Sequence, residues 1–122
     1  MIVTTGIDII EVKRIKEKFS KDDRFINLIF TENEINQVKN LEIKYLVLAG
    51  KWASKEAFSK AIGTGIGEEL DWKEIEIQND ITGKPELCVS DEIIAKFRIK
   101  SVSLSISHVS DYAVASVVLL ID

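Results

Sequence analysis

The sequence contains very little cysteine, proline or histidine. Its 122 residues include one cysteine, Cys88, one proline, Pro85, and one histidine, His108. A single cysteine excludes a disulfide within the chain and is typical of a protein from a reducing compartment. No cysteine or second histidine stands at ligand spacing from His108, which argues against a zinc site. The scarcity of proline, together with only six glycines, excludes a collagen-like or low-complexity chain.

Long apolar runs and a signal peptide are also missing. The run from Val117 to Ile121 is far shorter than the roughly 20 residues that a helix needs to cross a bilayer. The first residues do not combine a basic end, an apolar stretch and a small-residue cleavage site. We therefore expect a cytoplasmic protein.

The charge balance is mildly acidic, with one basic exception. Apolar residues make up 46% of the chain and charged residues 30%, which is typical of a folded protein. The length fits a single domain over residues 1–122. A net charge of −4 argues against general binding of nucleic acid. Residues 13–21 nevertheless hold five basic side chains and one acid, which indicates either a solvated surface or a docking site for an acidic protein. The basic residues are Lys13, Arg14, Lys16, Lys18 and Lys21.

The hydrophobic pattern predicts an α+β fold, with a mainly antiparallel sheet packed against one long helix and shorter helices. Strands are expected at residues 1–10, 72–78, 85–89, 102–106 and 112–121. Helices are expected at residues 10–19, 31–38, 43–62 and 90–97, and a loop at 20–24. Thr31 and Glu34 have the spacing of a capping box. In the long helix, an alanine recurs every four residues from Ala49 to Ala61, so this helix can approach a neighbour closely.

Two carboxylates are the first candidates for chemistry. Asp8 lies near the end of the first strand, and Glu56 lies inside the long helix. Two carboxylates converge in an enclosed site only when a cation is bound or a proton is shared, and Mg²⁺ prefers oxygen ligands. On the residues alone, Glu56 is more simply explained as the partner of Lys60 one turn later. Asp8 is equally well explained as a strand-end cap.

Two further features carry little information alone. The glycine-rich residues 63–67 follow a helix, whereas a P-loop precedes one, so a helix cap is the simpler interpretation. A flexible turn beside Lys60 could still bring backbone amides to a phosphate. His108 could join Asp111 in a catalytic triad, but no Gly-x-Ser-x-Gly motif accompanies it. A hydrogen-bonding turn residue explains His108 more simply.

Taken together, five segments resemble the holo-acyl-carrier-protein synthases, the small bacterial 4′-phosphopantetheinyl transferases. Their order and spacing match over nearly the whole chain. The segments are Gly6-Ile7-Asp8-Ile9 with Arg14; Phe30-Thr31-x-x-Glu34; the run from Lys51 to Ala61 with Gly63-Thr64-Gly65; Gly83-Lys84-Pro85; and Ser105-Ile106-Ser107-His108.

The resemblance implies an activity and roles for individual residues. The family transfers the 4′-phosphopantetheine arm of coenzyme A to a serine of an acyl carrier protein and releases adenosine 3′,5′-bisphosphate. Asp8 and Glu56 match the positions that hold Mg²⁺ on the pyrophosphate of coenzyme A, and Lys60 matches a phosphate-binding lysine. These three form the implied catalytic set. The coenzyme A site is implied to include Lys51, Lys60, Thr64, Gly65, Pro85 and His108. Lys51 stands where the family more often has arginine, so it keeps the charge without the planar fork.

The resemblance also implies partners. Acyl carrier proteins are acidic along their recognition helix, so the implied docking residues are Lys13, Arg14, Lys18 and Lys21. A homotrimer with active sites between subunits is implied as well. Two alternatives remain from the residues themselves. One is another Mg²⁺-dependent enzyme acting on phosphates, such as a small nucleotide hydrolase, and the other is a non-catalytic module that binds an acidic protein.

Overall fold

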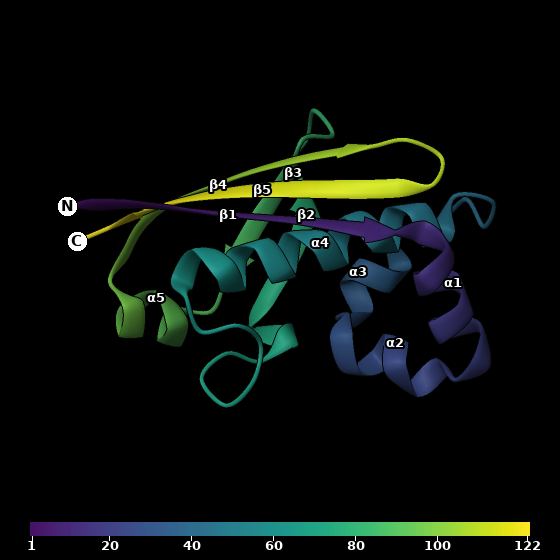
Figure 1. The fold of residues 1–122 in the computed structure, drawn as a ribbon, viewed down its shortest axis with the longest axis horizontal. Helices are drawn as coiled ribbons and strands as arrows, with labels where there is room; N and C mark the ends of the chain where they lie inside the picture. The colour runs from purple at the N-terminus through teal and green to yellow at the C-terminus, as the bar shows by residue number, and fades with distance from the viewer.

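Two antiparallel sheets and a long helix organise the computed structural model, which describes residues 1–122 (Figure 1). The strands are β1 (Ile2–Glu11), β2 (Ile75–Asn79), β3 (Pro85–Val89), β4 (Ile99–His108) and β5 (Tyr112–Ile121). The helices are α1 (Val12–Lys21), α2 (Asp23–Ile29), α3 (Glu32–Asn36), α4 (Lys44–Ile62) and α5 (Asp91–Phe97), with a 3₁₀ turn, η1 (Trp72–Glu74). The α+β class predicted from the sequence is confirmed.

The larger sheet joins the two ends of the chain. Its strand order is β1-β5-β4, and both pairings are antiparallel. Ile2 pairs with Ile121 and Glu11 with Tyr112, so the termini lie side by side at one end (Figure 1). The predicted hairpin of the last two strands is present, with Val109 donating to the carbonyl oxygen of Tyr112 at 2.9 Å. β2 and β3 form a separate two-stranded sheet.

Helix α4 covers one face of the larger sheet, and its repeated alanines allow the close approach to a neighbour that the sequence predicted. Gly6 of β1 is buried against this helix, where a Cβ would overlap the carbonyl oxygen of Ala57 and lie 2.8 Å from the backbone nitrogen of Ala61. Side chains on alternate β1 positions face the opposite way, leaving Ile7 63% and Ile9 66% exposed. The outer face of β1 is therefore apolar and uncovered within one chain.

A second apolar cluster fills the space between α4 and the first three helices. Phe19 of α1 and Phe30 after α2 meet edge to face, with ring centroids 5.8 Å apart. Leu48 of α4 and Ala113 of β5 complete this cluster, which anchors α1 beside the end of β1. No helix of the structure combines the length and the apolar character needed to span a membrane.

Three local expectations were wrong. The loop expected at residues 20–24 is reduced to Asp22, because α1 continues to Lys21 and residues 23–29 form α2, whose N-cap Asp22 accepts a hydrogen bond from the backbone nitrogen of Arg24 at 2.9 Å. At seven residues, α2 is too short to show a clear helical period. The strand expected from residue 72 begins at Ile75, because Asp71 and Glu74 form a capping box around η1. The strand expected at residues 102–106 extends over all of β4.

Candidate active site

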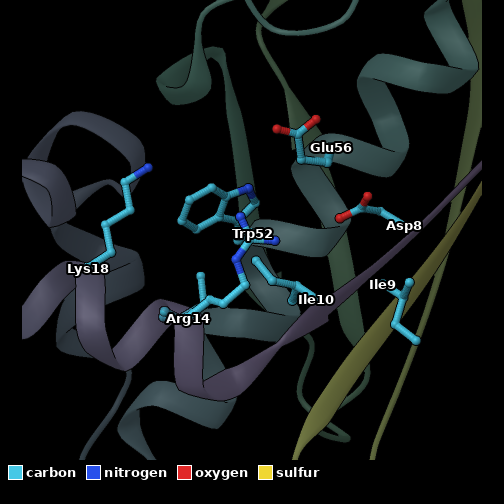
Figure 2. Close-up of a pocket in the computed structure, with 8 residues that line it drawn as sticks. Asp8, Ile9, Ile10, Arg14, Lys18, Trp52 and Glu56 are labelled. Atoms are coloured by element: carbon cyan, nitrogen blue, oxygen red, sulfur yellow. The ribbon is translucent and has the colours of Figure 1, made fainter.

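A cavity of about 240 Å³ lies where β1, α1 and α4 meet (Figure 2). Asp8 enters it from β1, and Glu56 enters it from α4. Arg14 and Lys18 of α1 line its other side, so it carries two acids and two bases. The remaining lining residues are Ile9, Ile10, Ile15 and Trp52. The structure thus brings together the two carboxylates that the sequence placed in a strand and a helix.

Lys60 pairs with Asp8 rather than with Glu56. Its ammonium nitrogen lies 3.0 Å from the Asp8 Oδ1 atom and donates to the carbonyl oxygen of Ile7 at 3.1 Å. The simpler explanation of Glu56, as the partner of Lys60 within the helix, was therefore wrong. Asp8 is partly shielded, whereas the Lys60 side chain is 54% exposed. The ammonium can therefore change partners without opening the core.

Glu56 is placed where its charge is unfavourable. Burial raises the pKa of Glu56 above its ordinary value, and the nearby charge of Asp8 raises this pKa further. A hydrogen bond from Trp52 and the charge of Lys60 act on the pKa in the opposite direction. An approaching cation would relieve the repulsion between the two carboxylates and favour the ionised form of both.

The donor set fits one type of metal ion. The structure contains no group of three or more histidine, cysteine, aspartate or glutamate side chains that could hold a metal by themselves. Asp8 and Glu56 offer two carboxylates around a shared cavity. Mg²⁺ is commonly held by one or two carboxylates, with substrate phosphates and water completing its oxygen shell. The pair therefore suits Mg²⁺ that binds together with a phosphate-bearing substrate.

Trp52 lines the cavity beside Glu56 and packs against two further aromatic rings outside the lining. The Trp52 ring lies 5.7 Å from the Phe19 ring and 5.6 Å from the Trp72 ring, measured between centroids. The Lys18 ammonium lies 5.1 Å from the centre of Trp52 and 5.3 Å from that of Phe25. Trp52 lies four residues before Glu56 and therefore on the same side of the helix, but nothing in the sequence indicated that Trp72 packs against Trp52. Trp72 lies 20 positions further along the chain, and only folding brings it there.

A second cavity, of about 230 Å³, lies on a different side of α4. It contains three of the residues implied for the coenzyme A site, Lys51, Pro85 and His108. Its α4 residues include Val47 and Gly50, whereas the first cavity uses Trp52 and Glu56. Successive side chains of an α-helix are rotated by about 100° around its axis, so these two sets of residues lie on different sides of α4. The structure therefore separates the predicted site residues into two groups.

Lys51 is already engaged within the chain. Its side chain is buried, and its ammonium donates to the carbonyl oxygen of Glu34 at 3.2 Å and to Gln37 Oε1 at 2.7 Å. An ammonium carries three N–H groups, so one remains for the second cavity. Burial lowers the pKa of Lys51, and the negative charge of Glu34 opposes this effect.

Thr64 and Gly65 lie in the loop after α4 and line neither cavity. Gly63 caps the helix with a φ of 96°, and its backbone nitrogen donates to the carbonyl oxygen of Ser59 at 2.9 Å. The interpretation of the glycine run as a helix cap is confirmed. Lys60 stands in the last turn before this loop, so the loop begins close to the Asp8 pair.

The basic residues of α1 are exposed, but they do not all border the same cavity. Arg14 and Lys18 border the first cavity. Lys13 lines a separate hollow with Asp111 beside the β4–β5 turn. Lys21 stands in the last turn of α1. Their role in docking a partner stays a prediction. It is best supported for Arg14 and Lys18, because these two residues line the same cavity as the carboxylates.

Comparison with known proteins identifies the family. Residues 4–117 match the model of the 4′-phosphopantetheinyl transferase superfamily. The chain belongs to that superfamily. A holo-[acyl-carrier-protein] synthase from Bacillus thuringiensis (strain Al Hakam) is 49% identical over 121 residues, covering 98% of this chain and 96% of the relative. The predicted resemblance and the assignment as an enzyme of the holo-[acyl-carrier-protein] synthase type are thereby confirmed.

Solved structures of superfamily members have the same fold. The Helicobacter pylori holo-[acyl-carrier-protein] synthase in complex with coenzyme A has a TM-score of 0.89 and 36% identity, covering 95% of this chain and 99% of that one. The Bacillus anthracis str. Ames enzyme in complex with CoA (3′,5′-ADP) has a TM-score of 0.81 and 43% identity, covering 98% of this chain and 96% of that one.

Proposed function

We propose that this chain transfers the 4′-phosphopantetheine group of coenzyme A to a serine of an apo acyl carrier protein. The observation that carries this proposal is the shared cavity of Asp8 and Glu56, with Lys60 in contact with Asp8. The names of the similar synthases, and the coenzyme A bound in two solved relatives, agree with this substrate pair. The chain acts as a single domain over residues 1–122, and the substrate and the single free cysteine suit the cytoplasm.

The reaction is a displacement at phosphorus. The serine oxygen forms a bond to the phosphorus that carries the pantetheine arm, while the bond to adenosine 3′,5′-bisphosphate breaks and the serine proton passes to a base. Asp8 and Glu56 would hold Mg²⁺, which supplies charge neutralisation on the diphosphate. Lys60 moves from Asp8 to the negative charge that develops on the leaving bisphosphate. Its exposed side chain allows that movement.

The two cavities support a role for neighbouring subunits. Asp8 and Glu56 line one cavity, while Lys51, Pro85 and His108 line the other on a different side of α4. A single coenzyme A reaches both groups if they come from adjacent copies of the chain. The uncovered apolar face of β1 offers a surface for such a copy. We propose a homotrimer in which each active site lies between two subunits.

A carrier-mass assay tests the proposed function. The protein is incubated with coenzyme A, Mg²⁺ and apo acyl carrier protein, and the carrier is weighed by intact mass spectrometry. The expected result is a carrier that has gained the phosphopantetheine arm, with one adenosine 3′,5′-bisphosphate released for each arm. Phosphate release without a carrier would instead favour a nucleotide hydrolase. Binding of the carrier without a mass change would favour a non-catalytic module.

The substitution Arg14→Glu is expected to weaken binding of the carrier protein more than binding of coenzyme A. Arg14 borders the cavity from exposed α1, where its charge can steer an acidic helix toward the two carboxylates. The KM for the carrier should rise about tenfold, which is the loss of one good charge contact, while the KM for coenzyme A changes little. Steady-state kinetics with each substrate varied in turn measure this difference. Salt should raise the KM for the carrier in the wild type, since exposed charges are screened within ~10 Å at 0.1 M.

Lys96→Glu is the matched control for Arg14→Glu, because it makes the same charge change in the last turn of α5. Its kinetic constants should stay close to those of the wild type. Equal increases in both KM values of Arg14→Glu, or kinetics independent of salt, would contradict the docking role.

The substitution Ile7→Glu is expected to dissociate the trimer. Ile7 is 63% exposed on the outer face of β1, and a charge there would be buried without a partner if another subunit covers it. Sedimentation velocity should report a shift from trimer to monomer, accompanied by loss of transfer. Ile81→Glu, at a fully exposed turn residue, is the control. A wild-type protein that sediments as an active monomer would reject the trimer.

A further inference from the structure

A buried ion pair joins α3 to α4, one residue before Glu56 in the chain, and has no part in the proposed reaction. Glu34 of α3 and Lys55 of α4 are completely buried, and the Lys55 Nζ atom lies 2.6 Å from Glu34 Oε1. Burial lowers the pKa of Lys55, and the charge of Glu34 opposes this effect. Replacement of such a pair by apolar residues often leaves stability unchanged or increases it. Stability alone is therefore a weak explanation for its presence.

The pair ties α4 to four other segments. Lys55 donates to the carbonyl oxygens of Ile29 at 2.7 Å and Trp72 at 3.1 Å. Glu34 accepts from the backbone nitrogens of Thr31 at 2.9 Å and Ile77 at 2.8 Å. All three N–H groups of the ammonium thus have acceptors, and both carboxylate oxygens have donors. A helix held in this way cannot turn about its axis without breaking several buried hydrogen bonds.

Contacts through the two tryptophans connect the ion pair to the cavity. Lys55 holds the backbone of Trp72, whose ring packs edge to face against Trp52 at 5.6 Å. Trp52 lines the cavity together with Glu56, which directly follows Lys55 in α4 (Figure 2). Rotation of α4 by a few tens of degrees would swing Glu56 away from Asp8. Misplacement by about 1 Å is enough to slow an enzyme roughly 100-fold.

We propose that Glu34 and Lys55 are positioning residues, which set the rotation of α4 and the Trp52 ring so that Glu56 faces Asp8. This inference rests on the proposed function for its kinetic consequence. Its structural consequence, the orientation of Trp52 against Trp72, holds whatever the substrate is.

The double variant Glu34→Gln/Lys55→Met tests the proposal. It removes both charges together, so neither is left unpaired, and glutamine can still serve in the Thr31 capping box. The chain has only two tryptophans, Trp52 and Trp72, so the exciton couplet in circular dichroism reports their mutual geometry. We expect a cooperatively folded protein with a weakened couplet. Its kcat should fall at least tenfold, while the KM for coenzyme A changes less than threefold.

Lys100→Met/Asp122→Asn is the matched control, because it also removes a lysine–carboxylate ion pair, in this case one with both side chains exposed. It should keep both the couplet and the kcat. If the double variant does not fold, Trp72→Leu provides a second test. Trp72 is only half-buried, and its replacement removes the ring contact with Trp52 while leaving the ion pair in place. A tenfold lower kcat is expected for it as well.

A folded double variant with the couplet and kcat of the wild type would overturn the proposal, as would a wild-type kcat in Trp72→Leu. A lost couplet with full kcat would also overturn it, because the pair would then orient the ring without affecting Glu56. A wild type that transfers nothing to the carrier would reject the proposed function instead. In that case the couplet still decides whether the pair orients Trp52.

Discussion

Replacement of Glu56 by alanine is expected to abolish transfer of the phosphopantetheine group while leaving the fold intact. Glu56 faces the cavity that Asp8 also enters, and it contributes no ion pair to the core. Under the proposed function, Glu56 would help to hold Mg²⁺, whose charge would stabilise the transition state by several kcal/mol. Since each ~1.4 kcal/mol changes a rate tenfold, kcat/KM should fall by at least about 100-fold.

The melting temperature of the Glu56→Ala variant should stay close to that of the wild type or increase. Burial and the charge of Asp8 both raise the pKa of Glu56, so the ionised side chain is held in an unfavourable place. Thermal unfolding followed by circular dichroism checks this, and intact mass of the carrier checks activity. Glu92→Ala, at an exposed position in the first turn of α5, is the control and should remain active. Full activity in Glu56→Ala would remove Glu56 from the site.

Replacement of Gly6 by alanine is expected to damage both stability and activity. A methyl group there would overlap the carbonyl oxygen of Ala57 and lie 2.8 Å from the backbone nitrogen of Ala61. These are backbone atoms of α4, so no side chain can move aside, and the whole helix must shift from β1. Overpacking of this kind costs about 3 kcal/mol or more. The melting temperature of a domain of this size should drop by roughly 10 °C.

The activity of Gly6→Ala should fall even well below its melting temperature, because the displaced helix carries Glu56 away from Asp8. Gly67→Ala is the matched control, since its added methyl group would meet no atom within 4 Å. Its stability should stay within about 0.5 kcal/mol of the wild type. A Gly6→Ala protein with wild-type melting and wild-type kcat would show that the contact between β1 and α4 is not rigid.

Local patterns predicted much of the secondary structure. The strand expected at residues 1–10 is present as β1, in which Ile7 and Ile9 lie on the face opposite Gly6 because side chains in a strand alternate. Thr31 and Glu34 form the expected capping box, and Gly63 caps α4, since both motifs need only residues within one turn. The short helix α2 was missed because seven residues do not repeat a helical pattern often enough.

The candidate site was predictable only in part. The resemblance to the synthases selected Asp8, Glu56 and Lys60, whereas the residues alone favoured a simpler role for Glu56 and left both roles of Asp8 open. It did not indicate that Lys60 contacts Asp8, which lies 52 positions away. Nor did it indicate that Lys51, Pro85 and His108 would line a different cavity from Glu56. The side of α4 on which each residue falls depends on how the helix packs.

The sequence by itself was enough to predict the family, the α+β class, the length of the long helix and the two candidate acids. The class and the helix length depend on residue type and on neighbours within a few positions, whereas the family depends on five segments whose order and spacing match over nearly the whole chain. Only the tertiary structure decided the partners of the charged groups. Lysine and glutamate are rarely buried in proteins, yet Glu34 and Lys55 are fully buried and paired. Burial depends on which faces of distant elements meet, and hydrogen bonds from Thr31, Ile77 and Lys55 make the buried charge of Glu34 tolerable.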